Sequence, residues 1–552
     1  MSTNSTAIYY QSDAYTTSKQ KLMGRNAAGE SFLRAYFKYD NSHNLYVYPV
    51  SLEDLDCFKR KAIAYNRHEP IECITKRSLT KLVDVGNLFV PGPGLDQFAH
   101  ERCFSGHNSW SLCGITHTTS SINAMDCISS LATAPIQEWD ALICTSNAVK
   151  KHVNETLNSQ FEYLKYRLGI SKLVLPQLPV IPLGIHTSDF HFTDSEKFSS
   201  RNTLGIDDNS IVILYTGRLS FHAKAHPLAM YQALELSSKQ TNIPIVLIEC
   251  GWHANQSIAD SFTEAAQRFC PSIKVLHLDG RINKNRSLAW SSADIFCSLP
   301  DNIQETFGIV PIEAMAAGLP VVVSDWDGYK DTVRDEIDGF RIPTLIPEEG
   351  LGADLMQRYS LGIDTYDMYC GHTSSLISVD VLSANRAFTK LIQSPSLRVK
   401  MGASGLKRAR EMYDWSVIYK QYDDLFNHLN LIRKSSVLND FDKQRFWPGR
   451  VNPFQGFSDY ATNQLSLNSK VSLVDDDFQI TFQRYIDIKD LKMVSFASYI
   501  LPTHEEVKCI FNNLSKAPMK ACDLLIPFEL KRRPFILRTL VSLLKFNLIK
   551  LV

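Results

Sequence analysis

The sequence lacks any long apolar segment: no run of about 20 apolar residues, the length of a membrane-spanning helix, occurs in its 552 residues. Residues 2–6 are polar and lack the apolar core of a secretory signal. Neither charge is in excess, because 58 Lys and Arg balance 58 Asp and Glu, and this gives no argument for a nucleic-acid partner. These absences predict a cytoplasmic protein, and the length predicts about three domains.

Paired cysteine motifs are absent as well. The 12 cysteines are spread singly, with no C-x-x-C pair and no spacing typical of zinc ligands. We therefore expect reduced, mostly buried thiols rather than a disulfide framework. The composition, 44% hydrophobic and 21% charged, is that of an ordinary soluble globular chain.

The sequence does contain a regular alternation of apolar strands and helices. Such alternation predicts an α/β protein with parallel, doubly wound sheets. The expected strands are residues 7–10, 45–48, 83–90, a short one ending before His117, 140–146, 211–219, 243–251, 273–278, 293–299 and 321–323.

The most informative stretch is residues 299–324, which follow one of these strands. A helix is expected to begin near Phe307 or Gly308, because Pro311 suits a first helical turn, and to end at Gly318. A helix that starts at the carboxyl end of a parallel strand lies where open α/β sheets bind ligands. Its free N–H groups and its dipole suit a phosphate.

Two carboxylates frame this helix start, Glu305 in the loop and Glu313 in the helix. At a rise of ~1.5 Å per residue they lie roughly 10 Å apart, farther than the about 5 Å between the carboxylates of a retaining glycosidase. The spacing suits the sugar and the ribose at the two ends of one long ligand, with a diphosphate between them. The alternative is a surface glutamate and a solvated helix glutamate.

Basic residues follow the strand at 211–219. Gly217, Arg218 and Lys224 stand at its end, before another expected helix. Arginine offers a planar fork and lysine a movable point charge, so the pair can neutralise a departing nucleoside diphosphate without a metal. The alternative is two surface cations.

These residues resemble the E-x7-E signature of retaining GT-B glycosyltransferases, in the glycogen-synthase and mannosyltransferase-like branch (family 4, group 1 type). The match includes Glu305, Gly308 and Glu313, with residues 314–318 and 320–322 around them. The resemblance implies two Rossmann-like domains that face a cleft, with the donor bound mainly to the second domain and the acceptor to the first.

The resemblance also implies roles for these residues. Glu305 would orient the donor sugar and Glu313 would hold the nucleotide ribose. The backbone around Thr306, Phe307 and Gly308 would contact phosphate and sugar. Arg218 and Lys224, preceded by Gly217, would stabilise the leaving diphosphate.

Four further residues are candidates through the same resemblance. His117 would touch the donor sugar near the reaction centre, although a lone histidine is more often a structural residue. Gly24 and Gly29 would belong to a glycine-bearing loop that approaches the ligand, or else to a plain turn. Arg281 would border the nucleotide base.

The sequence departs from the family pattern at two places. His186 stands where an acidic residue is common, in the segment that links the two domains. The gap between Arg218 and Lys224 is one residue longer than usual, and Ala225-His226 replaces a glycine.

Two acidic clusters resemble the D-x-D metal motif of the other main glycosyltransferase fold. They are Asp325-Trp326-Asp327 and residues 475–477. A metal would want such oxygen ligands beside a diphosphate. Because the basic residues already supply the charge, we expect no metal, and we interpret both clusters as turns.

The expected boundaries are 1–190 for the acceptor-side domain, 191–412 for the nucleotide-sugar domain, 413–435 for a helix that crosses back and 436–552 for a C-terminal extension. Residues 191–201 are polar and are interpreted as a linker. Residues 345–381 are an insertion without an assigned role.

The extension is expected to begin with a linker at 446–453 and to continue with two or three short amphipathic helices from His504. Their spacing resembles a small winged-helix-like bundle, suited to protein contact or acceptor docking. The amphipathic end could instead lie on the inner membrane that holds a lipid-linked acceptor, or be a packed core helix.

The sequence therefore predicts a retaining, metal-independent hexosyltransferase that moves a sugar from a nucleotide-sugar donor to a glycan or lipid-linked acceptor, in cell-envelope polysaccharide synthesis. No cofactor beyond the donor is expected. Two alternatives remain open, a nucleotide-sugar 2-epimerase and a non-catalytic scaffold that binds nucleotide sugar.

Overall fold

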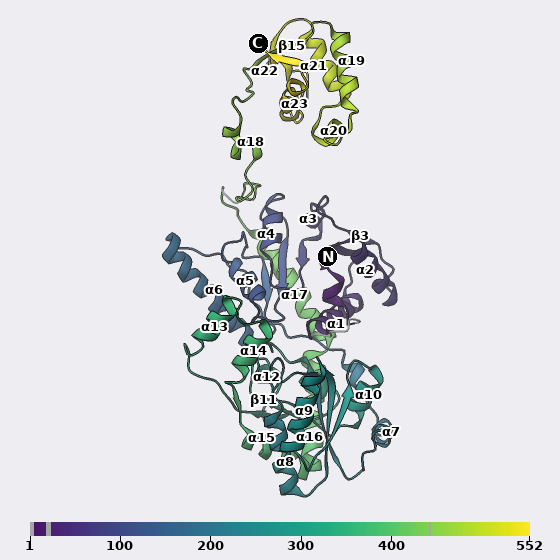
Figure 1. The fold of residues 1–552 in the computed structure, drawn as a ribbon. Helices are drawn as coiled ribbons and strands as arrows, with labels where there is room; N and C mark the ends of the chain where they lie inside the picture. Colours follow the sequence, from purple (N-terminus) through teal and green to yellow (C-terminus); the bar gives the residue numbers. More distant parts are fainter. Residues whose placement is uncertain (1–4, 18–23, 441–442) are drawn as a thin grey trace. The chain divides into compact units, whose positions relative to one another are not determined.

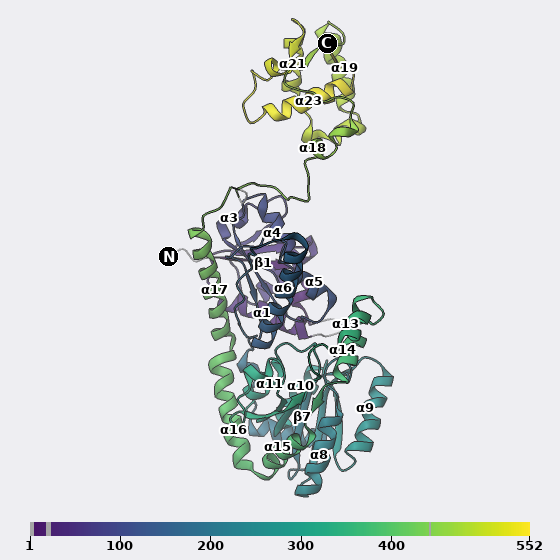
Figure 2. The same ribbon diagram turned by 90° about the vertical axis from the view of Figure 1, so that its left-hand side faces the viewer.

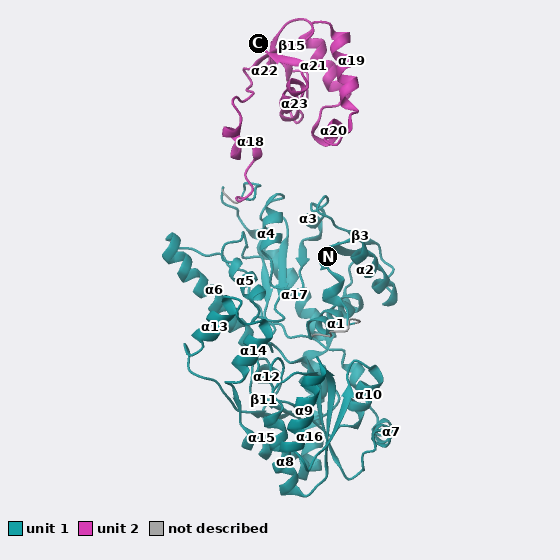
Figure 3. Ribbon diagram, viewed as in Figure 1, with its two compact units in different colours: residues 1–447 teal, residues 448–552 magenta. Residues whose placement is uncertain are grey.

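The computed structural model describes residues 5–17, 24–440 and 443–552. The chain divides into two compact units, Met1–Trp447 and Pro448–Val552 (Figure 3). The first unit contains two six-stranded sheets, each surrounded by helices (Figure 1). No helix in the described ranges is long and apolar enough to cross a membrane.

The first sheet is parallel throughout and has the order β3-β2-β1-β4-β5-β6. Helices α1, α2 and α17 cover one face and α3 to α6 the other, so both faces are buried, as parallel sheets require. The elements are β1 Thr6–Tyr10, α1 Gly24–Tyr39, β2 Leu45–Pro49, α2 Leu52–Ala64, β3 Ile71–Cys73, α3 Lys81–Val85, β4 Asn87–Phe89, α4 Asp96–Cys103, β5 Ser111–Ile115, α5 Ile122–Ser130, β6 Ala141–Ile143 and α6 Asn147–Leu168.

The second sheet is also parallel and has the order β12-β11-β10-β7-β8-β9. Its elements are α7 Asp194–Leu204, β7 Ile211–Leu219, α8 Leu228–Thr241, β8 Ile245–His253, α9 Gln256–Phe269, β9 Lys274–Asp279, α10 Asn283–Ser292, β10 Ile295–Ser298, α11 Ile309–Ala316, β11 Val321–Ser324, α12 Tyr329–Thr332, β12 Gly339–Ile342, α15 Val381–Gln393 and α16 Pro395–Arg408.

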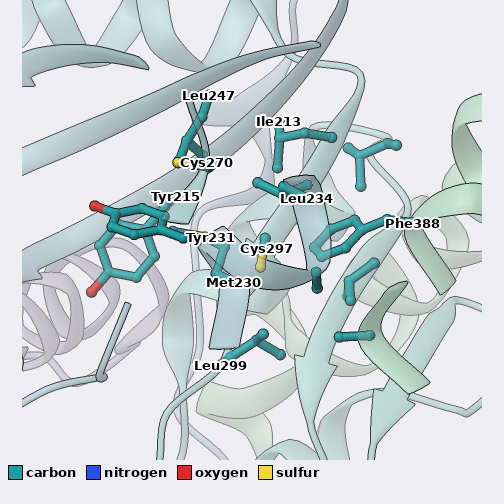
Figure 4. Packing of buried hydrophobic residues seen from close by; sticks show 14 of the residues in the cluster. Ile213, Tyr215, Met230, Tyr231, Leu234, Leu247, Cys270, Cys297, Leu299 and Phe388 are labelled. Atoms are coloured by element: carbon teal, nitrogen blue, oxygen red, sulfur yellow. The ribbon is translucent and has the colours of Figure 1, made fainter. Parts of the chain in front are cut away.

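Apolar side chains fill both faces of this sheet. On one face, Ile213 and Leu247 from the strands pack with Leu234 of α8 and Phe388 of α15, as Figure 4 shows. On the other face α10 and α11 pack against the strands, and Ile312 of α11 is fully buried. The strands predicted at 211–219, 243–251, 293–299 and 321–323 are therefore core strands, β9 is a partly exposed edge strand, and the predicted α/β class is confirmed.

The strand order gives the second sheet a topological switch point, the place where open α/β sheets bind ligands. In the second sheet the chain runs from β7 to β8 and β9, then returns to place β10 on the other side of β7. Helices therefore leave β7 and β10 toward opposite faces, and the carboxyl ends of these two strands form the topological switch point. The loops that follow β7 and β10 carry Arg218, Lys224 and residues 299–308.

After α16 the chain crosses back to the first sheet through α17 (Trp415–Ser435), which lies beside α1 (Figure 2). The indole Nε1 of Trp415 donates to Ser31 Oγ at 2.7 Å. Gly184, just ahead of the second domain, packs on the same indole, since a Cβ there would lie 2.5 Å from it. One tryptophan thus fixes the place where the chain passes twice between the domains.

Several predicted elements differ from the structure. Residues 83–90 are not one strand: α3 ends at Gly86, whose φ of 91° reverses the chain, and only Asn87–Phe89 form β4. The predicted linker at 191–201 is largely the helix α7. Its polar composition conceals a capping box, in which Thr193 and Glu196 bond to each other's backbone N–H.

The second unit is a small α/β bundle. Its strands β15 (Lys470–Leu473), β16 (Met519–Lys520) and β17 (Ile549–Leu551) form an antiparallel sheet in the order β16-β15-β17. Helices α19 (Phe478–Lys489), α21 (His504–Leu514), α22 (Ala521–Leu524) and α23 (Arg533–Lys545) supply the rest of its core. Within residues 475–477, Asp477 caps α19 by accepting from the N–H of Gln479 at 2.7 Å. The last helix is thus packed through Ile536 and Leu540, both fully buried.

Candidate functional site

The start of α11 is built around a glycine that no other residue could replace. Gly308 precedes the helix with φ 80°, a left-handed conformation. A Cβ at this position would lie 1.6 Å from Cε1 of Tyr329, a fully buried ring. The backbone can therefore turn into α11 with its first N–H groups open only because residue 308 has no side chain.

We expect Gly308→Ala to destabilise the protein far more than Gly318→Ala. Both glycines have positive φ, but nothing lies within 4 Å of a Cβ at Gly318. Gly318→Ala therefore costs only about 1–2 kcal/mol of backbone strain, whereas Gly308→Ala must also displace Tyr329, at roughly 1–3 kcal/mol more. Thermal unfolding of the two variants measures the difference, and equal melting temperatures would contradict this view of the turn.

The two predicted cations reach the loop before α11. Arg218 Nη2 donates to Gln304 Oε1 at 2.6 Å and to the carbonyl of Ala223 at 2.7 Å. Lys224 forms a short ion pair with Glu305, whose side chain is 11% exposed. The structure thus brings Arg218, Lys224 and Glu305 together at the switch point, directly ahead of the α11 N-terminus.

The lysine determines the protonation of Glu305. Burial alone would raise the pKa of this carboxyl, but the Lys224 ammonium and the N–H groups of Thr306 and Phe307 offset this and hold the pKa below its usual value. Glu305 is therefore a carboxylate at neutral pH, able to accept hydrogen bonds from hydroxyl groups.

Glu313 has the opposite environment. It points from α11, where burial raises its pKa to about 7 although the Arg286 guanidinium acts to lower it. Among the described residues no hydrogen bond to its side chain occurs. A ligand whose hydroxyl groups donate hydrogen bonds to this carboxyl group would lower the free-energy cost of its burial.

The edge of the first domain closes this site. The hydroxyl of Thr306 donates to the carbonyl of His117, and Ser146 Oγ donates to the carbonyl of Thr306 at 2.8 Å. Burial lowers the pKa of His117 to about 4, with a smaller contribution from the Arg25 guanidinium, so the imidazole is neutral. The backbone carbonyl of His117 is thus bonded to Thr306, the residue that follows Glu305.

Other predicted residues lie elsewhere. Gly24 is the first described residue of α1 and Gly29 lies inside that helix, so the predicted loop at Gly29 is wrong. Gly29 serves close packing, because a Cβ there would lie 2.0 Å from the backbone oxygen of Ala14. His186 is buried at the domain junction, with Nε2 3.3 Å from the carbonyl of Ser31.

Arg281 borders a separate hollow of about 360 Å³ at the carboxyl ends of β8 and β9. Its guanidinium is paired with Asp279 at 2.7 Å. Trp252 and His277 also line the hollow.

The acidic turn after β11 contacts protein groups. Asp325 lies 3.4 Å from Arg341, and Asp327 Oδ1 accepts from Ser146 Oγ at 3.3 Å. Burial, followed by the Glu305 charge, raises the pKa of Asp327 to about 8. Within the described part of the chain, no three His, Cys, Asp or Glu side chains form a set that could hold a metal ion.

Residues 196–349 match the family model described as Glycosyl transferases group 1. This part of the second domain is similar to the group 1 glycosyl transferases. An uncharacterized glycosyltransferase of Methanocaldococcus jannaschii is 28% identical over 242 residues, which are 43% of this chain and 54% of that protein. A phosphatidyl-myo-inositol mannosyltransferase of Mycobacterium tuberculosis is 26% identical over 230 residues, 41% of this chain and 50% of that protein. The matches thus span about half of those relatives.

The fold agrees with a solved glycosyltransferase structure. A glycosyltransferase from Rickettsia africae ESF-5 superposes with a TM-score of 0.50 at 12% identity, over 77% of this chain and 98% of that one. The second domain, which contains the matched residues, and the preceding doubly wound domain together form the GT-B fold, as the sequence predicted. The matched residues contain Arg218, Lys224, Glu305 and Glu313.

From the sequence, Gln304 and Ser146 are not recognised as residues of this site, and Asp327 is interpreted only as part of a turn. Gln304 holds Arg218, Ser146 holds Thr306, and Asp327 bonds to Ser146. Ser146 is the N-cap residue of α6, and this role accounts for a serine at that position without the site. Gln304 was visible beside Glu305, but no pattern distinguishes an amide that orients an arginine from a surface amide.

Proposed function

We propose that this protein transfers a sugar from a nucleotide-diphosphate sugar to an acceptor, with retention of the anomeric configuration. The observation that carries the proposal is the convergence of Arg218 and Lys224 on residues 304–305 at the open N-terminus of α11. Two cations and the backbone N–H groups at the start of α11 suit a diphosphate as it gains charge on leaving.

Each proposed role follows from the surroundings of the side chain. Arg218 and Lys224 would stabilise the leaving diphosphate, with Gly217 giving room and the backbone of Thr306, Phe307 and Gly308 offering N–H groups. Glu305 would accept from hydroxyls of the donor sugar. Glu313 would accept from the ribose. Neutral His117 would contact the sugar from the acceptor side.

The charge of the leaving group would be met by the protein alone, so we propose a metal-independent reaction without a cofactor. No protein carboxylate is assigned as base. The departing phosphate would take the acceptor proton on the same face of the sugar, which is how the family resemblance accounts for retention.

The acceptor is proposed to be a glycan or a lipid-linked molecule of the cell envelope. The name of the mycobacterial relative, a phosphatidyl-myo-inositol mannosyltransferase, agrees with an acceptor of this kind. A cytoplasmic protein that meets the inner membrane through its C-terminal unit would fit such an acceptor. Arg281 and its hollow are proposed for the base of the nucleotide.

The experiment is to incubate the purified chain with UDP-, GDP- and ADP-linked glucose, N-acetylglucosamine and mannose, and to measure released diphosphate and sugar products. Slow release of diphosphate with free or transferred sugar of retained configuration supports a transferase. Release of a 2-epimerised sugar would instead support an epimerase, and saturable binding without turnover would support a scaffold.

Ionisation of Glu313 is expected to lower the stability of the fold and to strengthen the binding of a nucleoside diphosphate. The folded state holds its proton up to about pH 7, against 4.5 for the ordinary group, so ionisation of Glu313 destabilises the fold as the pH rises through this range. Glu313→Gln should raise the melting temperature at pH 8.5 by about 2–4 °C, as roughly 1 kcal/mol would, and leave it unchanged at pH 5.

The same substitution should weaken binding of a nucleoside diphosphate at pH 8.5, because it removes a charged acceptor for the ribose. Calorimetric titration with UDP, GDP and ADP measures this. A variant that is no more stable at pH 8.5 than the parent would contradict the buried state of Glu313, and unchanged affinity would contradict its proposed role.

A further inference from the structure

A long connection between β12 and α15 contacts both domains of the first unit. We call residues 344–379 the strap. Its ends pair as the short antiparallel strands β13 (Thr344–Leu345) and β14 (Ser378–Val379), and between them lie α13 (Ala353–Ser360) and α14 (Tyr366–Ser374). Figures 1 and 2 both place α13 and α14 beside α5 of the first domain.

The strap has a fixed internal structure. Asp364, which is buried, accepts two hydrogen bonds from Arg358 at 2.8 and 3.0 Å, and lies 3.2 Å from His372 Nδ1. The rings of Tyr359 and Tyr369 stack with centroids 4.3 Å apart. These contacts therefore hold α13 and α14 against each other.

The strap is fastened to the second domain beside the cation site. Gly371 of α14 packs so closely on His222 that a Cβ would lie 3.0 Å from the His222 Cβ. The carbonyl of His222 in turn accepts from Asn302 at 2.9 Å. At its base, Thr344 Oγ1 donates to the carbonyl of Asp325 at 3.0 Å. The strap thus rests on the loops that follow β7 and β11, and the β7 loop is in turn bonded to Asn302 after β10.

Two of the strap's three tyrosine hydroxyls, those of Tyr359 and Tyr366, reach across to the first domain. The hydroxyl of Tyr366 lies 3.1 Å from Thr118 Oγ1 and 3.0 Å from Ser120 Oγ. The hydroxyl of Tyr359 accepts from the backbone N–H of Ile122 at 2.9 Å. All these partners lie in the loop that starts at His117 and runs into α5.

We propose that the strap links the two domains at the acceptor side of the cleft, and that Tyr366 is the positioning residue through which it holds the 117–121 loop, and so His117, in place for transfer. This inference rests on the proposed function for its effect on turnover, but the contacts are independent of it. His117 is then held from both sides, by Thr306 at its carbonyl and by Tyr366 one residue later.

The chemistry of these contacts suits a link that opens and re-forms. Burial raises the pKa of Tyr366 to about 12, so its hydroxyl stays protonated and remains a donor. Hydroxyl–hydroxyl bonds between neutral groups are individually weak. A domain movement that admits donor and acceptor can therefore break these hydrogen bonds in each turnover. A network of charged pairs would resist such a movement.

Hydrogen exchange on the full-length protein without ligand tests the link. The variants are Tyr366→Phe and Tyr359→Phe, and the matched control is Tyr369→Phe, which removes a strap hydroxyl that makes no hydrogen bond among the described residues. Exchange of the 117–122 amides should be about 5-fold faster in the first two variants, since each loses roughly 1 kcal/mol of hydrogen bonding. Equal exchange in all three would overturn the link.

Steady-state kinetics test the positioning role, with the nucleotide sugar that gives the most diphosphate in the donor panel. Tyr366→Phe should lower kcat about 10-fold or more through misplacement of His117, with the donor KM and the melting temperature close to those of Tyr369→Phe. A kcat equal to that of Tyr369→Phe would overturn the positioning role. Should the parent protein release no diphosphate from any donor, the proposed function fails, and the exchange result still decides whether the link exists.

Discussion

Replacing Arg218 with alanine is expected to lower the rate of diphosphate release by about 10³-fold. The guanidinium reaches the loop before α11, where its Nη2 bonds to Gln304 and to the Ala223 carbonyl. In the proposed reaction it gains most when charge collects on the leaving diphosphate, so its removal should affect kcat more than binding of the donor. Release of nucleoside diphosphate under saturating donor measures the effect.

Two further variants sharpen this test. Arg218→Lys keeps the charge but loses the planar fork, and should recover only part of the rate. Arg268→Ala is the matched control, because Arg268 pairs on the exposed face of α9 with Glu264 at 2.9 Å and should leave the rate unchanged. Similar rates for Arg218→Ala and Arg268→Ala would mean that Arg218 is a structural residue.

The second large effect is expected from Lys224→Met, which should lower turnover about 10²-fold at neutral pH through the lost cation and also change the pH profile. Lys224 is what holds the pKa of buried Glu305 below its usual value. Without the ammonium, burial raises that pKa, so Glu305 takes up a proton at a higher pH. The acid limb of the activity profile should therefore move toward neutral pH.

The same pair affects stability with a defined sign. Because the folded pKa of Glu305 is depressed, its ionisation contributes stability that is present above the ordinary pKa and is lost as the pH falls through the folded value. Lys224→Met should remove this contribution. The control is Lys239→Met, whose exposed ammonium pairs with Glu235 at 2.9 Å. An acid limb that stays in place would contradict the coupling of Lys224 to Glu305.

The local signals predicted the second domain well. Pro311 and Gly318 bracket a helix expected to begin near Phe307 or Gly308, and α11 runs from Ile309 to Ala316. The β-branched residues of the neighbouring strands favour a buried strand, since another placement would expose their side chains to water. Gly308 was recognised as part of a pattern, but only its left-handed φ and the ring of Tyr329 explain why it must be glycine.

The residues that failed prediction are those whose role depends on distant segments. Gly29 resembles a loop glycine in sequence, yet it lies in α1 because Ala14 packs against it. Thr193 and Glu196 form a capping box that the polar composition around them concealed. The strap was visible as extra length only, because the bond from Tyr366 to Thr118 joins residues far apart in the chain.

The central claim is that a nucleoside diphosphate binds at the start of α11, held by Arg218 and Lys224. A crystal structure of the full chain soaked with UDP, GDP or ADP tests it most directly. The account predicts the diphosphate within hydrogen-bond distance of both cations and of the N–H groups that follow Gly308, with the ribose at Glu313. A diphosphate bound away from Arg218 and the α11 N-terminus would contradict it.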